Sequence, residues 1–175
     1  MGKMMKMKIK VPKDAEEFIE NRKKDLEGYT ASRGKAKDED LYVGVYAELA
    51  VFDYLLSQDL YVTSPDFKMH KKKSHAADLV AEDSSGVRYH VHVKGQSKQS
   101  LEKYGHSWLF QRNDPLFTGN KCKGEINFVV CCSVDVENKE VEVMLDAPFE
   151  DLKFGECKLV WFQKTKVALY LKDQI

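Results

Sequence analysis

The stretch from His75 to Gln96 constrains the fold most, because it holds two β-prone runs on either side of a turn. The turn is Asp83-Ser-Ser-Gly86. A short Ser/Gly-containing break between two such runs is typical of a β-hairpin. We therefore predict two antiparallel strands, at about residues 76–82 and 87–94.

Two charged residues stand out within this hairpin. Alternation along the second strand predicts Val91 and Val93 on one face and His92 and Lys94 on the other. On the first strand Asp78 interrupts an apolar run, and a carboxylate buried there without a partner would be costly. The hairpin brings Asp78 and Lys94 near each other, so each would offset the desolvation of the other.

The composition indicates one globular domain of 175 residues, with 43% hydrophobic and 11% aromatic residues. Lys plus Arg and Asp plus Glu both number 28, so any nucleic-acid-binding surface must be local. No apolar run approaches the roughly 18 residues of a membrane span, and the first residues lack the apolar core of a signal peptide. The 4 cysteines lack CxxC spacing, which argues against zinc and predicts reduced, packed thiols in a cytoplasmic protein.

Residues 1–40 are interpreted as an N-terminal basic leader, helix and linker packed on a main domain of residues 41–175. A short strand is expected at Met7–Val11, and a helix follows Pro12 and closes at Gly28. The charged stretch from Thr30 to Asp40 suits a mobile linker by composition. Its acidic end would equally suit a helix N-terminus, where carboxylates complement the helix dipole.

The strongest helical periodicity spans about residues 40–57, where apolar residues recur on one stripe. Glu48 lies on the flank of that stripe. A glutamate in such a position is as readily a solvated side chain as a functional one.

Basic residues gather in two places after this helix. Lys71, Lys72 and Lys73 precede the Asp78 strand and form either a phosphate-binding cluster or a solvated loop. The segment from Ser97 to Gly124 mixes basic and aromatic residues, and about 107–112 of it is predicted as a strand or a short helix. Within it, Lys98 and Arg112 are candidate nucleic-acid contacts, and Trp108 is either a core residue or a base-stacking one.

Three further strand regions complete the chain. Ile126–Val134 is a near-continuous apolar run, which suits a central strand buried on both faces. Val141–Leu145 is the returning strand of a hairpin, and 159–162 with 167–171 is predicted as a final hairpin. The order of elements predicts a mixed α/β fold.

The order of Glu48 on a helix, Asp78 on a strand and Lys94 on the next strand resembles the PD-(D/E)XK nuclease superfamily. That superfamily includes restriction endonucleases and Holliday-junction resolvases. The resemblance covers residues 41–96 and rests on Gly44-Val-Tyr-Ala-Glu48, Ala77-Asp78-Leu-Val and His92-Val-Lys94-Gly-Gln96. It implies a restriction-endonuclease-like core, in which a central mixed β-sheet is flanked by helices.

The resemblance also implies a chemistry for these positions. Asp78 would be the main ligand of Mg²⁺ or Mn²⁺, with Glu48 as a second carboxylate and the Val93 carbonyl completing the coordination. Lys94 would position the attacking water or stabilise charge on the phosphate. Gln96 would orient Lys94 or touch the phosphate. DNA is the implied substrate, although the sequence does not separate DNA from RNA, and a homodimer is compatible with the family.

His92 departs from the family pattern, which has Asp or Glu two residues before the lysine. Imidazole is a poor ligand for Mg²⁺ and a better one for Mn²⁺. Three readings follow: Glu48 replaces the missing carboxylate, His92 acts as a ligand or base, or the site is degenerate. His92 would alternatively be an ordinary surface histidine, and His90 beside it adds to a histidine-rich face.

The function expected from the sequence is therefore metal-dependent hydrolysis of phosphodiester bonds in DNA. The alternative within the same fold is a catalytically degenerate nucleic-acid-binding protein. A third class is an unrelated α/β protein in which Asp78 and Lys94 form only a structural ion pair.

Overall fold

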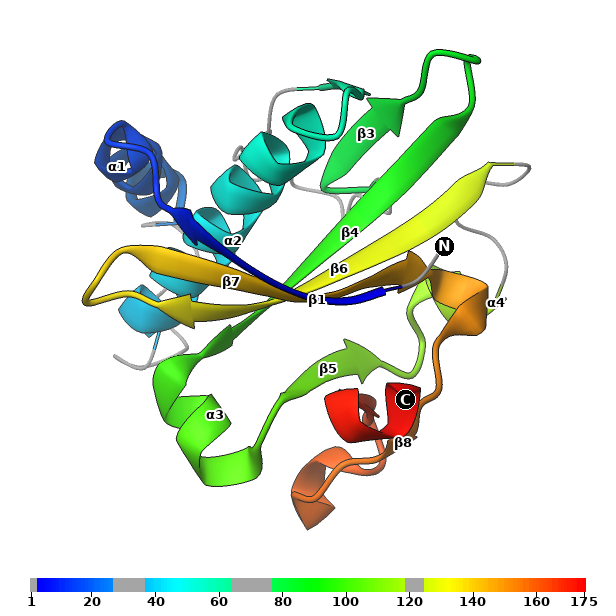
Figure 1. Cartoon of the computed structure of the whole chain (residues 1–175). Coiled ribbons are helices and arrows are strands. Elements are labelled where there is room, and N and C mark those ends of the chain that lie inside the picture. The colour runs from blue at the N-terminus through cyan, green and yellow to red at the C-terminus, as the bar shows by residue number, and fades with distance from the viewer. Residues whose placement is uncertain (1–2, 27–36, 64–76, 119–124) are drawn as a thin grey trace.

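The computed structural model describes residues 3–26, 37–63, 77–118 and 125–175 and has a mixed α/β architecture, with a curled mixed sheet flanked by helices (Figure 1). In chain order the elements are β1 (Lys3–Lys10), α1 (Ala15–Leu26), α2 (Lys37–Leu56), β2 (Tyr61–Val62), β3 (Leu79–Glu82), β4 (Arg88–Ser97), α3 (Lys98–Tyr104), β5 (Ser107–Gln111), α4 (Pro115–Thr118), β6 (Ile126–Asp135), β7 (Glu140–Pro148), the 3₁₀ turn η2 (Phe149–Asp151), β8 (Gly155–Glu156), η3 (Val160–Phe162), β9 (Lys166–Tyr170) and η4 (Leu171–Gln174).

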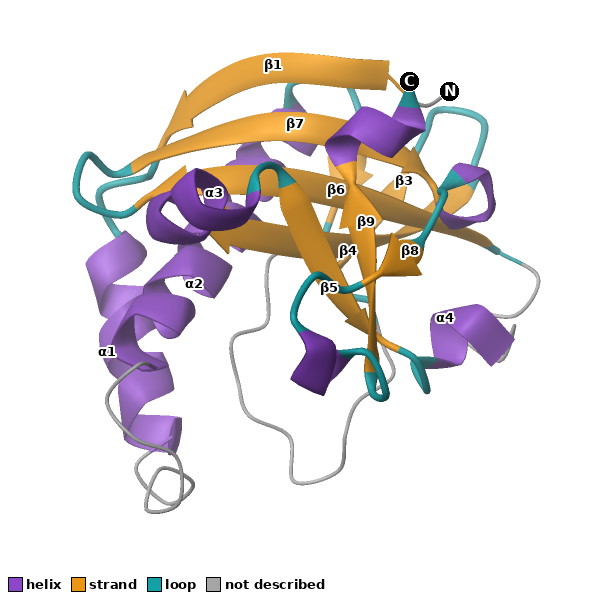
Figure 2. Ribbon diagram, turned by 90° about the horizontal axis from the view of Figure 1, so that it is seen from below, coloured by secondary structure: helices purple, strands orange, loops and turns teal. Residues whose placement is uncertain are grey.

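The main sheet has six strands in the order β1-β7-β6-β4-β3-β2. Strands β4 and β6 run parallel, and the other neighbouring pairs in this sheet are antiparallel. Parallel neighbours need a crossover connection, here supplied by the segment that holds α3, β5 and α4. The smaller sheet, β5-β9-β8, packs beside the main sheet (Figure 2).

The central strands are buried on both faces, which explains the apolar run predicted at Ile126–Val134. Along β6, Val130 and Cys132 belong to the apolar cluster that α2 covers. Val129 and Cys131, which point the other way, belong to a second cluster with Trp108 of β5. A strand between two apolar layers loses the alternation of a half-exposed strand.

The predicted hairpin is confirmed, with β3 and β4 pairing antiparallel from Leu79 opposite Val91 to Glu82 opposite Arg88. The predicted faces of β4 are also correct, because Val91 and Val93 contact the cluster beneath α2. The structured strand continues to Ser97, beyond the predicted end at residue 94.

The predicted final hairpin is wrong, although its second strand, predicted at 167–171, is present as β9. Residues 160–162 form the 3₁₀ turn η3 instead of a strand, while β9 pairs with β5 and β8. The segment predicted as a strand or short helix at about 107–112 is the strand β5. A short apolar run has the same local sequence pattern in a 3₁₀ turn and in a short strand. Whether the run pairs with a distant strand decides which of the two structures forms.

Trp108 is a core residue. Its side chain is 2% exposed, and its indole N–H donates a 2.9 Å hydrogen bond to the carbonyl of Cys132. The buried indole nitrogen is thus satisfied by the main sheet. The predicted packing role for the cysteines holds for Cys131, Cys132 and Cys157, which are buried and free.

The N-terminal segment is built into the main sheet. Strand β1 pairs with β7 at the sheet edge and is longer than the strand expected at Met7–Val11. Helix α2 begins at Lys37, so the acidic run that ends at Asp40 lies in its first turn, as one of the two readings predicts. The rest of the predicted linker, residues 30–36, lies outside the described residues.

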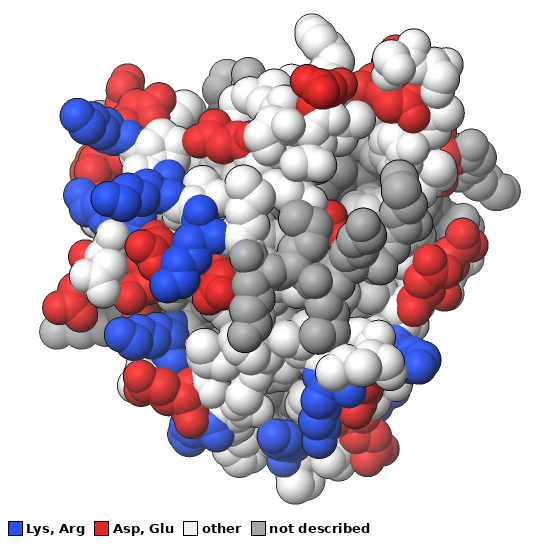
Figure 3. Space-filling model, viewed as in Figure 1, with Lys and Arg blue, Asp and Glu red and all other residues white. Residues whose placement is uncertain are grey.

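Figure 3 shows acidic and basic side chains intermingled over one side of the molecule, as the balanced composition leads one to expect. Helix α2 is the longest in the described ranges, and neither it nor another helix there is long and apolar enough to cross a membrane.

Gly95 is required for the approach of α2 to β4. A Cβ atom at Gly95 would lie 2.9 Å from Cγ1 of Val43 and 3.2 Å from Cβ of Ala47. Both distances are shorter than an ordinary van der Waals contact between carbon atoms. By contrast, a Cβ atom at Gly44, which lies on α2, would meet no other atom within 4 Å.

We expect Gly95→Val to lower the free energy of unfolding by about 2 kcal/mol, because the added carbons force the helix away from the strand. Gly44→Ala is the matched control. It should raise the free energy of unfolding by up to about 1 kcal/mol, because alanine favours a helix interior. Urea denaturation followed by circular dichroism measures both. Equal effects of the two variants would contradict a close approach at Gly95.

Candidate active site

The carboxylate of Asp78 is anchored to the neighbouring strand. Its Oδ2 accepts a 2.7 Å hydrogen bond from the backbone N–H of Val93. Asp78 directly precedes β3 and is exposed to solvent. The bond holds the carboxylate beside β4, one residue from Lys94, while leaving it open to solvent.

The register explains which side chains share this place. Leu79 is the last residue of β3 paired with β4, opposite Val91. One step further in the same register, Asp78 lies opposite His92, and opposite residues of an antiparallel pair point to the same face. His92 and Lys94 also share a face of β4, so the hairpin brings Asp78, His92 and Lys94 onto one side of the sheet.

Lys94 extends toward the smaller sheet. Its ammonium lies 4.7 Å from the ring centroid of Phe110, a fully buried residue of β5. Within the described residues no ion pair joins Asp78 to Lys94, so the two side chains share a face of the hairpin without a direct contact between their charges.

The same ammonium acts on a buried thiol. Burial raises the pKa of Cys131 well above its ordinary value, the neighbouring Cys132 adds to the increase, and the positive charge of Lys94 opposes it. Lys94 therefore lies close to β6 as well as to β5.

His92 is not a surface histidine. It is 4% exposed, and its Nε2 lies 3.1 Å from Oδ1 of Asn127 on β6. His90 contacts the carboxylate of Glu125 at the start of the same strand. The two histidines thus link β4 to β6 by polar contacts across the parallel pair.

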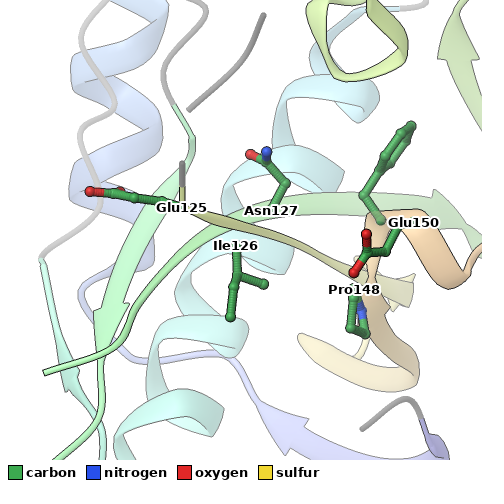
Figure 4. A pocket seen from close by; sticks show the side chains of 6 residues that line it. Glu125, Ile126, Asn127, Pro148 and Glu150 are labelled. Atoms are coloured by element: carbon green, nitrogen blue, oxygen red, sulfur yellow. The ribbon is translucent and has the colours of Figure 1, made fainter. Parts of the chain in front are cut away.

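A pocket of about 230 Å³ opens where β6 begins and β7 ends (Figure 4). Figure 4 shows Ile126 and Asn127 pointing in opposite directions from β6. Because Asn127 contacts His92, one wall of the pocket lies next to the histidine-bearing face of β4. The pocket is lined by Glu125, Ile126, Asn127, Pro148, Phe149 and Glu150.

Glu48 comes from the helix on the other face of β4. It is half-buried on α2 and follows Ala47, which packs against Gly95. The backbone of Glu48 therefore lies over the part of β4 that follows Lys94. The structure brings Asp78, Val93, His92 and Lys94 together on the hairpin, with the helix that carries Glu48 packed over the next residue.

Gln96 has a different environment from Asp78. It is 4% exposed, and its Nε2 donates a 2.8 Å hydrogen bond to the carbonyl of Gly105. Its Oε1 accepts a 3.2 Å hydrogen bond from the N–H of Ser107. Gln96 thus ties the end of β4 to the turn that starts β5.

The expected nucleic-acid contacts are dispersed. Lys98 forms a 3.7 Å ion pair with Asp135, and Nε of Arg112 donates a 2.8 Å hydrogen bond to the carbonyl of Gln163. Lys71, Lys72 and Lys73 lie outside the described residues.

The residues of the hairpin fit a hard divalent cation only as a small ligand set. Within the described ranges, the structure has no group of three or more His, Cys, Asp or Glu side chains placed to hold a metal. Mg²⁺ commonly keeps several waters and takes only one or two carboxylates. The exposed carboxylate of Asp78 and the backbone carbonyl of Val93 could supply part of such a set, whereas the helix that carries Glu48 packs on the other face of β4.

Sequence reasoning missed Asn127 and Phe110, which contact His92 and Lys94. Both come from elements that the parallel pairing and the smaller sheet bring next to β4. No local sequence pattern indicates such contacts, because they depend on strands that lie more than ten residues from His92 and Lys94 in the chain. No protein-family model matches the chain, and no curated protein is significantly similar to it.

The Asp78 hydrogen bond predicts different stabilities for two variants. Asp78→Asn keeps a side-chain oxygen for the N–H of Val93 and should unfold within about 0.5 kcal/mol of the wild type. Asp78→Ala loses the acceptor and should be less stable by about 1 kcal/mol. Urea denaturation of the two variants checks the difference. If both are as stable as the wild type, the bond does not anchor the hairpin.

Proposed function

We propose that the protein is a metal-dependent nuclease of the PD-(D/E)XK type, with a restriction-endonuclease-like core built from α2, β2, β3, β4 and β6. The observation that carries the proposal is the hydrogen bond from Val93 to Asp78. It holds an exposed carboxylate beside the strand that carries Lys94. The order of Glu48 on a helix, Asp78 before one strand and Lys94 on the next supports it.

The roles are those that the resemblance implies for these positions. Asp78 and the carbonyl of Val93 would hold Mg²⁺ or Mn²⁺, with Glu48 as a second carboxylate, and the bound ion would supply positive charge and an activated water. Lys94 stabilises the negative charge that develops on the phosphate. The contact with Phe110 limits the hydration of the ammonium on one side, which strengthens its electrostatic effect.

His92 occupies the position where the superfamily has a carboxylate. Its imidazole, next to the amide of Asn127, favours Mn²⁺ over Mg²⁺ if it contributes to the site. The buried contact between His92 and Asn127 also supports the second candidate, a nucleic-acid-binding protein that has lost catalysis. The proposed substrate is DNA, with RNA as the other polymer to be tested, and the proposed location is the cytoplasm.

We expect Asp78→Asn and Lys94→Met each to reduce cleavage by about 100-fold or more. Asparagine keeps an acceptor for the N–H of Val93, and methionine keeps an unbranched side chain beside Phe110 while removing the charge, so neither loss would reflect unfolding. The measurement is cleavage of labelled duplex, branched and single-stranded DNA and of RNA, with Mg²⁺ or Mn²⁺.

Lys8→Gln is the matched control, because it removes an exposed lysine charge on β1, at the edge of the sheet, without touching the hairpin residues. It should retain cleavage within about twofold. Wild-type rates for Asp78→Asn or Lys94→Met would overturn the proposed site. Metal-independent nucleic-acid binding by a wild type that cleaves nothing would favour the second candidate.

A separate prediction concerns the metal preference. His92→Glu restores the family arrangement, and an anionic oxygen favours a hard cation, so the ratio of the Mg²⁺ rate to the Mn²⁺ rate should rise by about tenfold. His92→Asn, which supplies no anionic oxygen, should raise that ratio less than His92→Glu does. The comparison uses initial rates at matched metal concentrations, and an unchanged ratio in His92→Glu would exclude position 92 from the metal site.

A further inference from the structure

The 3₁₀ turn η3 exposes two large apolar side chains. Val160 is 72% exposed and Trp161 is 71% exposed. The other tryptophan of the chain, Trp108, is 2% exposed. Tryptophan at a surface commonly marks a contact with a partner.

The surroundings of this turn are basic. Residues 155–166 contain three lysines, Lys158, Lys164 and Lys166, and one acidic residue, Glu156. Arg112 joins them, because its Nε donates to the carbonyl of Gln163. Figure 3 shows basic side chains together with acidic ones and uncharged surface along the lower edge of the molecule, where Figure 1 places β8 and the turns next to it.

Several of these cations are held in place. Nζ of Lys158 donates a 3.0 Å hydrogen bond to the carbonyl of Tyr104. Nζ of Lys166 lies 4.3 Å from the ring centroid of Phe162, the residue after Trp161. A fixed cation loses less conformational entropy when it contacts an anion.

The turn is connected to the candidate active site through the smaller sheet. Lys94 lies over Phe110, and Phe110 is paired with Val167 of β9. One residue beyond β5, the N–H of Arg112 donates a 2.9 Å hydrogen bond to the carbonyl of Thr165, in the turn between η3 and β9. Figure 2 shows β5 and β9 side by side, so η3 lies at the end of the sheet that Lys94 contacts.

We propose that Trp161 is a stacking platform for an unpaired base of a nucleic-acid strand, and that Lys158, Lys164 and Arg112 contact the phosphates beside that base. The proposal rests on the proposed function and names the part of the surface that binds the substrate strand. Indole rings stack on bases of every sequence, and the lysines and arginine neutralise the backbone.

The charge of the surface argues for this occupant over a second copy of the chain. A symmetric contact through Trp161 would bring the same cations against one another. A stable protein interface also buries roughly 800 Å² of surface per partner around an apolar centre. The turn η3 exposes two large apolar side chains, which is a small centre for such an interface. An anionic strand that carries flat rings matches both the charge and the indole.

The test measures binding of a fluorescein-labelled oligothymidylate of about 16 nucleotides in EDTA, so that cleavage does not contribute. Trp161→Ala should weaken binding by at least about fivefold, and Trp161→Phe should weaken it less. Lys164→Gln should reduce the slope of log K against log salt by about 0.7. Tyr61→Ala is the matched control, because Tyr61 is 79% exposed on β2, and it should bind like the wild type.

Intrinsic fluorescence gives a second measurement. The difference between wild type and Trp161→Phe isolates Trp161, and the oligonucleotide should quench that difference, leaving the buried Trp108 unaffected. Wild-type affinity for Trp161→Ala, or concentration-dependent self-association abolished by that variant, would overturn the proposal. Cleavage by Asp78→Asn tests the proposed active site, and oligonucleotide binding by Trp161→Ala tests the proposed stacking surface. Each proposal can therefore fail while the other stands.

Discussion

The rest of the structure depends on the parallel pairing of β4 and β6. This pair is buried on both faces, beneath α2 on one side and beneath β5 and β9 on the other. Two parallel neighbours require a crossover segment between them, and here that segment contributes β5, the strand that meets Lys94. The central pair therefore organises both apolar clusters and the surroundings of the candidate site.

The two faces of β4 carry different parts of the candidate site. Gly95 lets α2 approach one face and brings the helix that carries Glu48 over the strand. The other face holds His92 and Lys94, whose contacts are Asn127 of β6 and Phe110 of β5. Asp78 joins them through the backbone of Val93, so its position depends on the hairpin register and not on a direct ion pair.

The smaller sheet connects the hairpin to the exposed turn η3. β5 runs from the Gln96-anchored turn to Arg112, whose backbone and side chain both bond the η3–β9 segment. The paired strands of this sheet thus carry Phe110, the packing partner of Lys94, and end beside the turn that holds Trp161.

The sequence by itself determined the β3–β4 hairpin, the helix α2, the buried strand β6 and the faces of β4, because each rests on local periodicity or turn chemistry. Only the tertiary structure decided that His92 is buried against Asn127, that Lys94 lies over Phe110, and that residues 160–162 form an exposed turn in place of a strand. These contacts join residues from 16 to more than 30 positions apart, and strand pairing at such separations is set by the packing of the whole chain, which no local pattern encodes.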